Sequence, residues 1–354
     1  MKTKQLITVV VAGLLLAGLT ATAGAQQAHI DKTVGSINKK KPVAVTWRNY
    51  TRADTDFYFK GYADKGGFGK FFHTRGVVPI DEQVVIGMNR DTMYSVGVFD
   101  LTTPLTITKP DTGDRFQSFQ IIDQDQYTKD VIYEPGKYTF TQEKIGTRYV
   151  GVFVRTLVDS SDPADVKKVA QIQDQIKVSQ SSPGKFEIPN WDQDGLEKMR
   201  DAINVLAATM KDADGAYGDK DEVDPVKFLM GCALGWGGNP SYAATYLNKY
   251  PEGNDGKTAY TVNLKDVPVD GFWSVSLYNK ERFFEKNKYN SYSINSVTAE
   301  KDKDGSVTLH FGGDPKQPNF LYIMDGWNYI VRLYRPRKAV QDGTYEFPEL
   351  QPVK

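Results

Sequence analysis

The apolar residues of this chain change their spacing twice along the sequence, and this limits the folds that the chain can adopt. From Val43 to Val158 they form short alternating segments separated by turn-forming residues, a pattern typical of strands. From Pro163 to Asn248 they recur every three or four positions, which predicts helices. From Thr258 onward the alternating segments return. This order predicts a mainly β protein in which a helical connector separates two β domains.

The two β regions contain strand patterns between turn-forming clusters. In the N-terminal region we expect strands at Val84–Met88, Met93–Asp100, Leu105–Ile107, Phe116–Ile122, Tyr138–Thr141 and Tyr149–Leu157. In the C-terminal region we expect them at Thr258–Asn263, Phe272–Tyr278, Ser306–Phe311, Phe320–Ile323 and Tyr329–Tyr334. Turn-prone clusters such as Pro110–Asp114 and Glu134–Lys137 separate the N-terminal strands, so this region predicts a β-sandwich.

The connector predicts four helices. Asp162 is a good N-cap residue, and the proline that follows it suits the first helical position. A second helix carries an apolar stripe formed by Leu196, Met199, Ile203, Leu206 and Met210. Further helices are expected after Asp224-Pro225, ending near Gly235, and after Asn239-Pro240. Apolar stripes must be buried, so we expect these helices to pack against the β domains.

Residues 1–25 have the form of a cleavable secretion signal. Two lysines precede the uncharged apolar run Leu6–Leu19, and Ala23-Gly24-Ala25 has the small residues that signal peptidase requires. The alternative, a transmembrane anchor, needs about 20 strongly apolar residues, and this run becomes polar before that length. We therefore expect a mature protein that begins at Gln26, is periplasmic or secreted, and has no membrane partner once the signal is removed.

Composition excludes several classes of partner and site. Lys and Arg together number 44, and so do Asp and Glu, so the chain has no net charge to attract nucleic acid or an anionic membrane. Its single cysteine, Cys232, lies among apolar residues, which predicts a buried thiol and excludes an internal disulfide. The sequence has no nucleophile elbow, zinc-protease motif or dinucleotide fingerprint, and only three histidines. We therefore predict no metal and no cofactor.

Several motifs match those of a known two-domain family. The N-terminal motifs are Asn89-Arg90-Asp91-Thr92-Met93-Tyr94-Ser95, Val98-Phe99-Asp100-Leu101, and Asp114-Arg115-Phe116-Gln117-Ser118-Phe119-Gln120 followed by Asp123. The C-terminal motifs are Gly235-Trp236-Gly237-Gly238-Asn239-Pro240, Asp270-Gly271-Phe272-Trp273-Ser274-Val275, Asp304-Gly305-Ser306 and Arg332-Leu333-Tyr334. By these motifs the chain resembles the family called domain of unknown function 1254, followed by its partner, domain of unknown function 1214.

The resemblance implies a fold and brings no activity. It implies an immunoglobulin-like β-sandwich at 26–160, a helical connector at 161–250 and a jelly-roll-like β-sandwich at 251–354. The family has Asn-Trp-Leu-Pro before its last strand, whereas this chain has Asn319-Phe320-Leu321-Tyr322. Any site that the tryptophan and proline shape in the family is therefore altered here.

The polar run Asn89–Thr92 is the first candidate site. It lies between two expected strands, at one end of a sandwich, where loops commonly carry function. Arg90 could bind a carboxylate or phosphate through two parallel hydrogen bonds, and Asp91 could accept a proton or bind a sugar hydroxyl. The alternative is a turn in which the Asn and Asp side chains bond their own backbone.

Other candidates have equally plain alternatives. The acidic cluster of Asp123, Asp125, Asp130 and Glu134 could serve glycoside hydrolysis or hold calcium, or its acids could be solvated loop residues. His73 has apolar neighbours and is either a core histidine or a catalyst. Tryptophans in the C-terminal half could stack on sugars, but alternation along Phe272–Tyr278 places Trp273 with Val275 and Leu277 on a core face.

Three functions remain open at this stage. The first is binding of a carbohydrate or similar small polar ligand in the groove between two sandwiches. The second is a carboxylate-dependent hydrolase or lyase that acts on such a ligand, and the third is a structural envelope role. The residues expected to act in catalysis are Asp91, Arg90, Asp123 and His73. The residues expected to bind the ligand are Asn89, Tyr94, Gln120, Tyr127 and Trp236.

Overall fold

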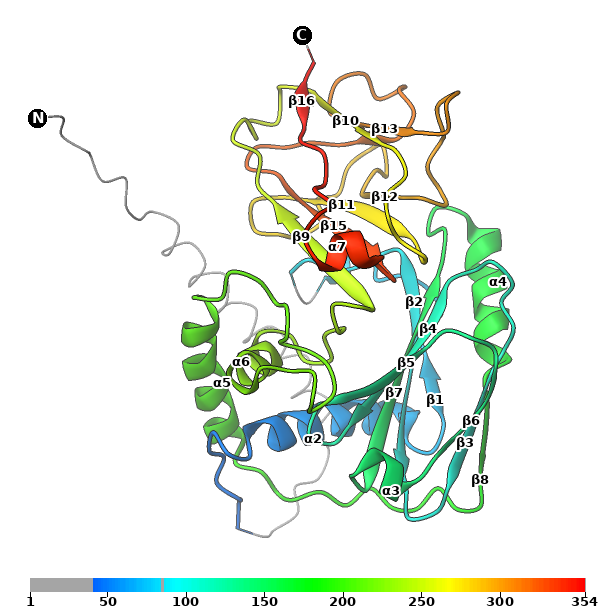
Figure 1. Cartoon of the computed structure of the whole chain (residues 1–354), viewed down its shortest axis with the longest axis vertical. Coiled ribbons are helices and arrows are strands. Elements are labelled where there is room, and N and C mark those ends of the chain that lie inside the picture. The colour runs from blue at the N-terminus through cyan, green and yellow to red at the C-terminus, as the bar shows by residue number, and fades with distance from the viewer. Residues whose placement is uncertain (1–40, 84–85, 354) are drawn as a thin grey trace, which may run out of the picture.

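The computed structural model describes residues 41–83 and 86–353, and the predicted secretion signal lies outside this part of the chain. The described chain is mainly β, with antiparallel sheets in two domains and a short helical region between them (Figure 1). This confirms the predicted fold class, while the finer immunoglobulin-like and jelly-roll-like descriptions stay predictions. None of the helices in the described ranges is long and apolar enough to cross a membrane.

Two sheets form the N-terminal domain. The larger has the order β1-β2-β7-β4-β5 and consists of β1 (Phe71–His73), β2 (Thr92–Asp100), β7 (Tyr149–Leu157), β4 (Gln117–Asp123) and β5 (Thr128–Ile132). The smaller has the order β6-β3-β8 and consists of β6 (Gly136–Phe140), β3 (Leu105–Lys109) and β8 (Lys177–Gln180). Leu105 and Ile107 of the smaller sheet share one buried core with Val150 and Val152 of the larger. Because side chains alternate along a strand, Arg155 of β7 lies on the outer face.

The C-terminal domain also has two sheets around one core. One has the order β14-β13-β10-β16 and consists of β14 (Phe320–Leu321), β13 (Val307–Phe311), β10 (Tyr260–Leu264) and β16 (Gln351–Pro352). The other has the order β12-β11-β15-β9 and consists of β12 (Ser293–Asn295), β11 (Trp273–Tyr278), β15 (Asn328–Tyr334) and β9 (Ala244–Lys249). Trp273, Val275 and Leu277 lie in the core between these sheets, as their alternation predicts. The opposite face of β11 and β15 is therefore free to meet the N-terminal domain.

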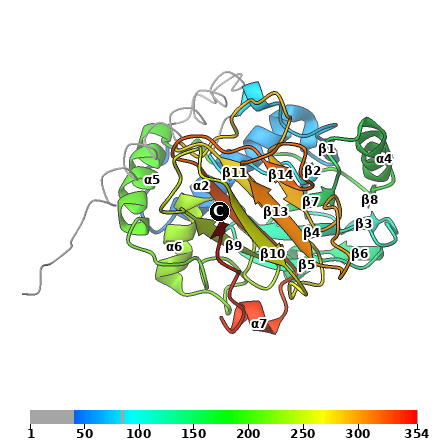
Figure 2. The ribbon, with the colours of Figure 1, turned by 90° about the horizontal axis from the view of Figure 1, so that it is seen from above.

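Helices lie beside both faces of the large N-terminal sheet. They are α2 (Tyr50–Tyr62), α4 (Pro163–Asp174), α5 (Gln193–Ala207) and α6 (Pro225–Leu234), with the short α3 (Gln142–Ile145) and α7 (Lys338–Gln341) elsewhere. Side chains of α2, α5 and α6, including the predicted buried Cys232, share one apolar cluster. Seen from above, the C-terminal strands lie over the N-terminal ones, with α4 and α5 at opposite sides (Figure 2).

Several local predictions were wrong. The predicted strand Val84–Met88 is not a strand over its described residues 86–88, of which 86 and 87 form a turn, and the helix expected after Asn239-Pro240 is a turn followed by strand β9. In the second predicted helix Leu206 is 59% exposed, so the apolar stripe is buried only over its earlier turns. Helix α2 was not predicted, because its aromatic and threonine residues suit a strand by composition. Its helical form is decided by packing on two sides, since Tyr50 and Ala53 are buried against α5 and α6 while Phe59 is buried against the large sheet.

Candidate functional site

The outer face of the large N-terminal sheet changes its covering along β7. At Gly151 the covering is helix α2, whose Phe59 ring leaves no room for a Cβ atom. At Phe153 it is Trp236 of the segment after α6, with ring centroids 5.0 Å apart. At Leu157 it is the C-terminal domain, through a shared apolar cluster. Arg155 lies between the last two positions, at the junction of the connector and both β domains.

Arg155 is held by neutral groups. Its Nη1 donates to Oε1 of Gln120 at 2.8 Å, its Nη2 lies 3.5 Å from the carbonyl oxygen of Gly237, and its guanidinium lies 5.8 Å from the centre of the Tyr94 ring. The amide nitrogen of Gln120 donates to Thr128 and to a backbone carbonyl, which fixes the amide so that its oxygen points at the guanidinium. Within the described ranges no carboxylate pairs with Arg155. This arginine is therefore a cation without a counter-ion in the structure.

Tyrosine hydroxyls from both domains surround the guanidinium. Tyr94 lies directly across from Arg155 in the β2–β7 register. Tyr246 of β9 and Tyr334 of β15 approach from the C-terminal domain, close enough for their hydroxyls to interact electrostatically with the arginine. The hydroxyl of Tyr246 accepts from Nδ2 of Asn239 at 2.8 Å, and that of Tyr334 accepts from Nδ2 of Asn89 at 3.0 Å. We call Arg155 and these three tyrosines the Arg155 cluster.

The electrostatics of the cluster keep the arginine charged and the phenols neutral. Burial disfavours the charged form of Arg155, but Tyr94, Tyr246 and Tyr334 outweigh it, so the pKa of Arg155 is raised. Burial raises the pKa of Tyr334 well above its usual value, with Tyr246 and Tyr94 adding to the rise. Burial likewise raises the pKa of the neighbouring Tyr62 to about 12. The cluster therefore offers a positive charge and protonated hydroxyls at neutral pH.

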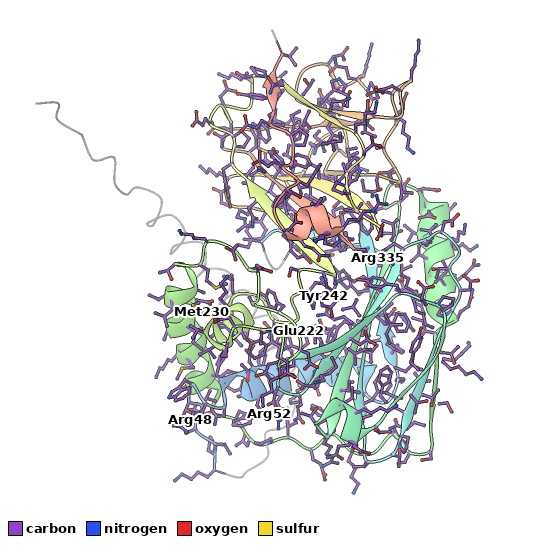
Figure 3. All side chains as sticks on the ribbon, in the orientation of Figure 1. Arg48, Arg52, Glu222, Met230, Tyr242 and Arg335 are labelled. Atoms are coloured by element: carbon purple, nitrogen blue, oxygen red, sulfur yellow. The ribbon has the colours of Figure 1, made fainter. Side chains whose placement is uncertain are left out.

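The cluster reaches solvent on the side of Tyr246, which is 42% exposed, while Arg155 itself is half-buried. A pocket of about 300 Å³ adjoins this side and is lined by residues that include Tyr217, Glu222, Tyr242 and Gln341. Pro240, which also lines the pocket, directly follows Asn239, whose side chain donates to Tyr246. Figure 3 shows Glu222 and Tyr242 from separate segments close to each other beside the junction of the domains.

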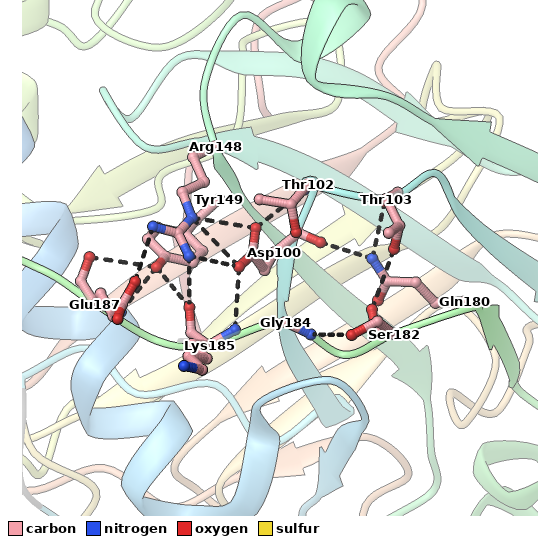
Figure 4. A network of polar contacts seen from close by, with 10 residues as sticks. All are labelled: Asp100, Thr102, Thr103, Arg148, Tyr149, Gln180, Ser182, Gly184, Lys185 and Glu187. Atoms are coloured by element: carbon pink, nitrogen blue, oxygen red, sulfur yellow. Dashed lines mark hydrogen bonds and ion pairs between the residues drawn. The ribbon is translucent and has the colours of Figure 1, made fainter.

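Arg148, just before the same strand, shows how a structural arginine of this protein is satisfied. It donates to both carboxylate oxygens of Asp100, to Glu187 and to the carbonyl oxygen of Lys185 (Figure 4). Asp100 is 1% exposed in this ion pair, so the carboxylate is held for the arginine. Arg155 has no such partner among the described residues, and this contrast makes it the stronger candidate for ligand binding.

Four of the predicted ligand residues converge on this cluster. Tyr94 belongs to it, Asn89 and Gln120 bond its members, and Trp236 forms the neighbouring aromatic wall. The sequence reasoning missed Arg155, although a lone charge within an apolar strand was visible in Tyr149–Leu157. It also missed Tyr246 and Tyr334, because the sequence shows them only as polar-tipped residues in apolar strands.

Asp91 and Arg90 have structural partners between the domains. Asp91 is 2% exposed, and its Oδ1 accepts from Ser293 at 2.9 Å and from Asn295 at 3.2 Å. Arg90 is half-buried, donates to the carbonyl oxygen of Val78 and lies over the ring of Tyr292. The Asn89 side chain accepts from the backbone N–H of Asp91, which is the turn that the plainer interpretation predicts. The geometry thus favours the turn.

The remaining predicted residues lie away from the Arg155 cluster. Asp123 accepts from the backbone N–H groups of Asp125 and Tyr127 in a tight turn, and burial, with the charge of Asp125, raises its pKa to about 7. The Tyr127 ring stacks on Phe228 at 4.3 Å. His73 bonds Ser95 at 2.7 Å on the opposite face of β2 from Tyr94, and burial lowers its pKa.

The predicted carboxylate pair is not brought together. In the register with β7, the residue after Asp91 lies opposite Leu157, whereas Asp123 lies opposite Val150. At about 3.3 Å per residue the two aspartates are about 25 Å apart along the sheet. Glycoside hydrolysis by two carboxylates uses separations of about 5–10 Å. Asp91 and Asp123 therefore do not form a hydrolytic pair.

Fold and site together define a class: a protein of two β domains that meet through an arginine-centred polar face beside a helical connector. More particularly, the chain belongs to a two-domain family. The family model described as protein of unknown function (DUF1254) matches residues 68–180, and the one described as protein of unknown function (DUF1214) matches residues 241–338. No curated protein matches the chain.

A solved structure shares this fold. The chain is similar to the VPA0106 protein from Vibrio parahaemolyticus, with 19% identity, a TM-score of 0.68, and coverage of 95% of this chain and 100% of that one. An uncharacterised protein from Burkholderia cenocepacia matches at 15% identity with a TM-score of 0.49, covering 96% of this chain and 98% of that one. At such identities the first likeness shows the fold alone.

Proposed function

We propose that this chain is an exported protein that binds a small polar, sugar-like ligand between its two β domains, at the Arg155 cluster. The observation that supports it best is convergence. Asn89, Tyr94 and Gln120 come from separate strands and loops of the N-terminal domain, Trp236 comes from the connector, and all gather around Arg155. Ligand sites commonly occur between domains, where a few polar groups meet an aromatic wall.

The chemistry of the cluster suits a ligand with hydroxyl groups and an apolar face. Sugars offer hydroxyls that donate and accept, together with C–H faces that pack on aromatic rings. Trp236 forms an aromatic wall beside the cluster, where it stacks on Tyr58 at 4.5 Å and contacts Phe153 edge-on. Export is the part of the proposal that depends on residues 1–25. The alternative function, a carboxylate-dependent hydrolase, loses its support because Asp91 and Asp123 lie far apart.

The proposal is tested by ligand-induced stabilisation of the chain from Gln26 to Lys354. A panel of neutral sugars, polyols and sugar acids is screened at millimolar concentration by thermal melting. At least one member should raise the Tm, since a ligand at 100 times its Kd stabilises the folded state by about 2.7 kcal/mol.

Two matched variants locate the binding. Tyr94→Phe removes a hydroxyl of the cluster, whereas Tyr260→Phe removes one in the outer C-terminal sheet that donates to Gly253. The Tm rise should shrink in Tyr94→Phe and persist in Tyr260→Phe. If no member of the panel raises the Tm, or if the rise is as large in Tyr94→Phe as in the parent, the proposed function is wrong.

A further inference from the structure

We propose that the Arg155 cluster recognises a single carboxylate, so that the ligand class is a sugar acid in preference to a neutral sugar. The inference rests on the proposed function and names the chemistry of the ligand. It follows from the kind of hydrogen-bonding groups that meet at the cluster, from the partners that hold them, and from the charge that they leave unbalanced.

The groups that meet at the cluster are donors. The arginine can only donate, and a guanidinium presents five N–H groups. The described residues accept from it at Gln120 and Gly237, and the contact to Gly237 is long at 3.5 Å. Arg155 therefore has donor capacity left for a ligand.

Two asparagines turn the tyrosines into donors as well. Nδ2 of Asn239 donates to the hydroxyl of Tyr246, and Nδ2 of Asn89 donates to the hydroxyl of Tyr334. A hydroxyl that accepts from an amide keeps its own hydrogen for another acceptor. Within the part of the chain that the structure describes, neither hydroxyl donates to a protein group. Both hydrogens are thus available to an anion that also contacts Arg155.

A buried hydroxyl beside the cluster also lacks a partner. The hydroxyl of Tyr133, which directly follows β5, is buried and makes no hydrogen bond to the described residues. Arg155 and Arg335 both act on this group electrostatically. A buried hydroxyl without a partner costs free energy, and a bound ligand with an acceptor oxygen or an ordered water would remove that cost.

The charge of the cluster fits one negative charge. Arg332, a buried arginine of this interface, is already satisfied by Ser276, Tyr278 and two backbone carbonyls, and Asp91 offsets its charge. Arg335 stands outside the Arg155 cluster, with its guanidinium 4.5 Å from the centre of the Tyr133 ring. Within the cluster itself, Arg155 is the charge that no carboxylate among the described residues balances. A carboxylate carries one charge and two oxygens that match a guanidinium, whereas a phosphate monoester carries about −1.5 to −2 at pH 7.

The experiment compares sugars that differ only in a carboxylate. Isothermal titration measures binding of galacturonate against galactose and of glucuronate against glucose to the chain from Gln26 to Lys354, with inorganic phosphate as a further probe. At least one sugar acid should bind, and about tenfold or more tightly than its neutral partner, because a hydrogen bond to a charged group is worth roughly that factor.

Variants separate the cluster from the rest of the surface. Arg155→Gln should weaken binding of the sugar acid by about 10–100-fold. Tyr246→Phe should weaken it by about 3–10-fold, and this change lies on an exposed residue, so the variant should fold if Arg155→Gln does not. Arg75→Gln, at an exposed arginine paired with Asp174, is the matched control and should bind as the parent does.

The outcomes distinguish the two proposals. If neutral sugars bind as tightly as their acids and Arg155→Gln keeps the affinity, the carboxylate inference is wrong while polar ligand binding stands. Binding of phosphate without binding of any sugar acid overturns the inference in favour of a phosphorylated ligand. If no probe binds, both the inference and the proposed function fail. Tight binding of a sugar acid that is lost in Arg155→Gln and weakened in Tyr246→Phe supports the inference.

Discussion

Truncation of Asp91 to alanine should show that the run Asn89–Thr92 joins the two domains and does not itself bind the ligand. The Asp91 side chain is 2% exposed, and its Oδ1 accepts from the side chains of Ser293 and Asn295. Both partners belong to β12 of the C-terminal domain. The carboxylate therefore links the domains through buried hydrogen bonds.

The magnitude follows from the partners that the truncation leaves behind. Each lost hydrogen bond to a charged group costs about 1.5–3 kcal/mol. The guanidinium of Arg332 is 3% exposed and loses a charge that favours its ionised form. Breaking a buried charge interaction from one side costs about 3–5 kcal/mol in total. At about 2–3 °C per kcal/mol for a chain of this size, the Tm of Asp91→Ala should fall by about 6–15 °C.

The assay is thermal melting at neutral pH without ligand. Asp81→Ala is the matched control, because Asp81 pairs with Lys286 of the C-terminal domain at 2.6 Å, but with side chains that are 68% and 71% exposed. An exposed pair contributes about 0–1 kcal/mol, so this control should lose less than about 3 °C. If Asp91→Ala melts within that range of the parent, the buried link between the domains does not exist as described.

Three further predictions concern other parts of the chain. Arg155→Met should keep the Tm of the ligand-free protein or raise it, because Arg155 is half-buried and pairs with no carboxylate among the described residues, so an apolar replacement removes no ion pair; a marked fall in thermal melting would make Arg155 structural. Burial raises the pKa of Asp123 to about 7, above an unfolded value of about 3.9. The protonated Asp123 therefore stabilises the folded state fully below about pH 3.9, and this contribution is lost as the pH rises to neutrality. Asp123→Asn should therefore raise the Tm more at pH 8 than at pH 5, and equal changes at both pH values would contradict the shift. Protein recovered from the periplasm or medium should begin at Gln26 by N-terminal sequencing, and a retained Met1 would refute the predicted signal.

Much of the fold could be predicted because its patterns are local. The alternation in Tyr149–Leu157 gave strand β7 with the same bounds, and the apolar face of Phe272–Tyr278 gave the correct core side. Helices α4 and α6 were predicted from an aspartate followed by proline, and both aspartates cap their helices by accepting from backbone N–H groups. These signals reside within a few neighbouring residues, so they survive without knowledge of the packing.

Helix α2 shows where local pattern fails. Its sequence, from Tyr50 to Tyr62, is rich in residues that suit strands. The buried ion pair of Asp54 with Arg200 of α5 at 2.5 Å, and the packing of Phe59 on the outer face of β7, hold it as a helix. Both partners are more than 90 residues further along the chain. Propensity was therefore overridden by contacts that no local window contains.

For the candidate site, the sequence by itself determined that Asn89, Tyr94, Gln120 and Trp236 belong to motifs worth testing, and that Arg155 is a lone charge in an apolar strand. Only the tertiary structure decided that these residues lie together at one site. The register of β2, β7 and β4 aligns the N-terminal members, and the docking of β9 and β15 adds the tyrosines of the C-terminal domain. The same docking buried Asp91 against Ser293 and Asn295, although by residue type it was as good a candidate as any. A charge becomes a ligand site or a structural link according to whether the fold brings it a partner, and that is fixed by contacts between segments far apart in the sequence.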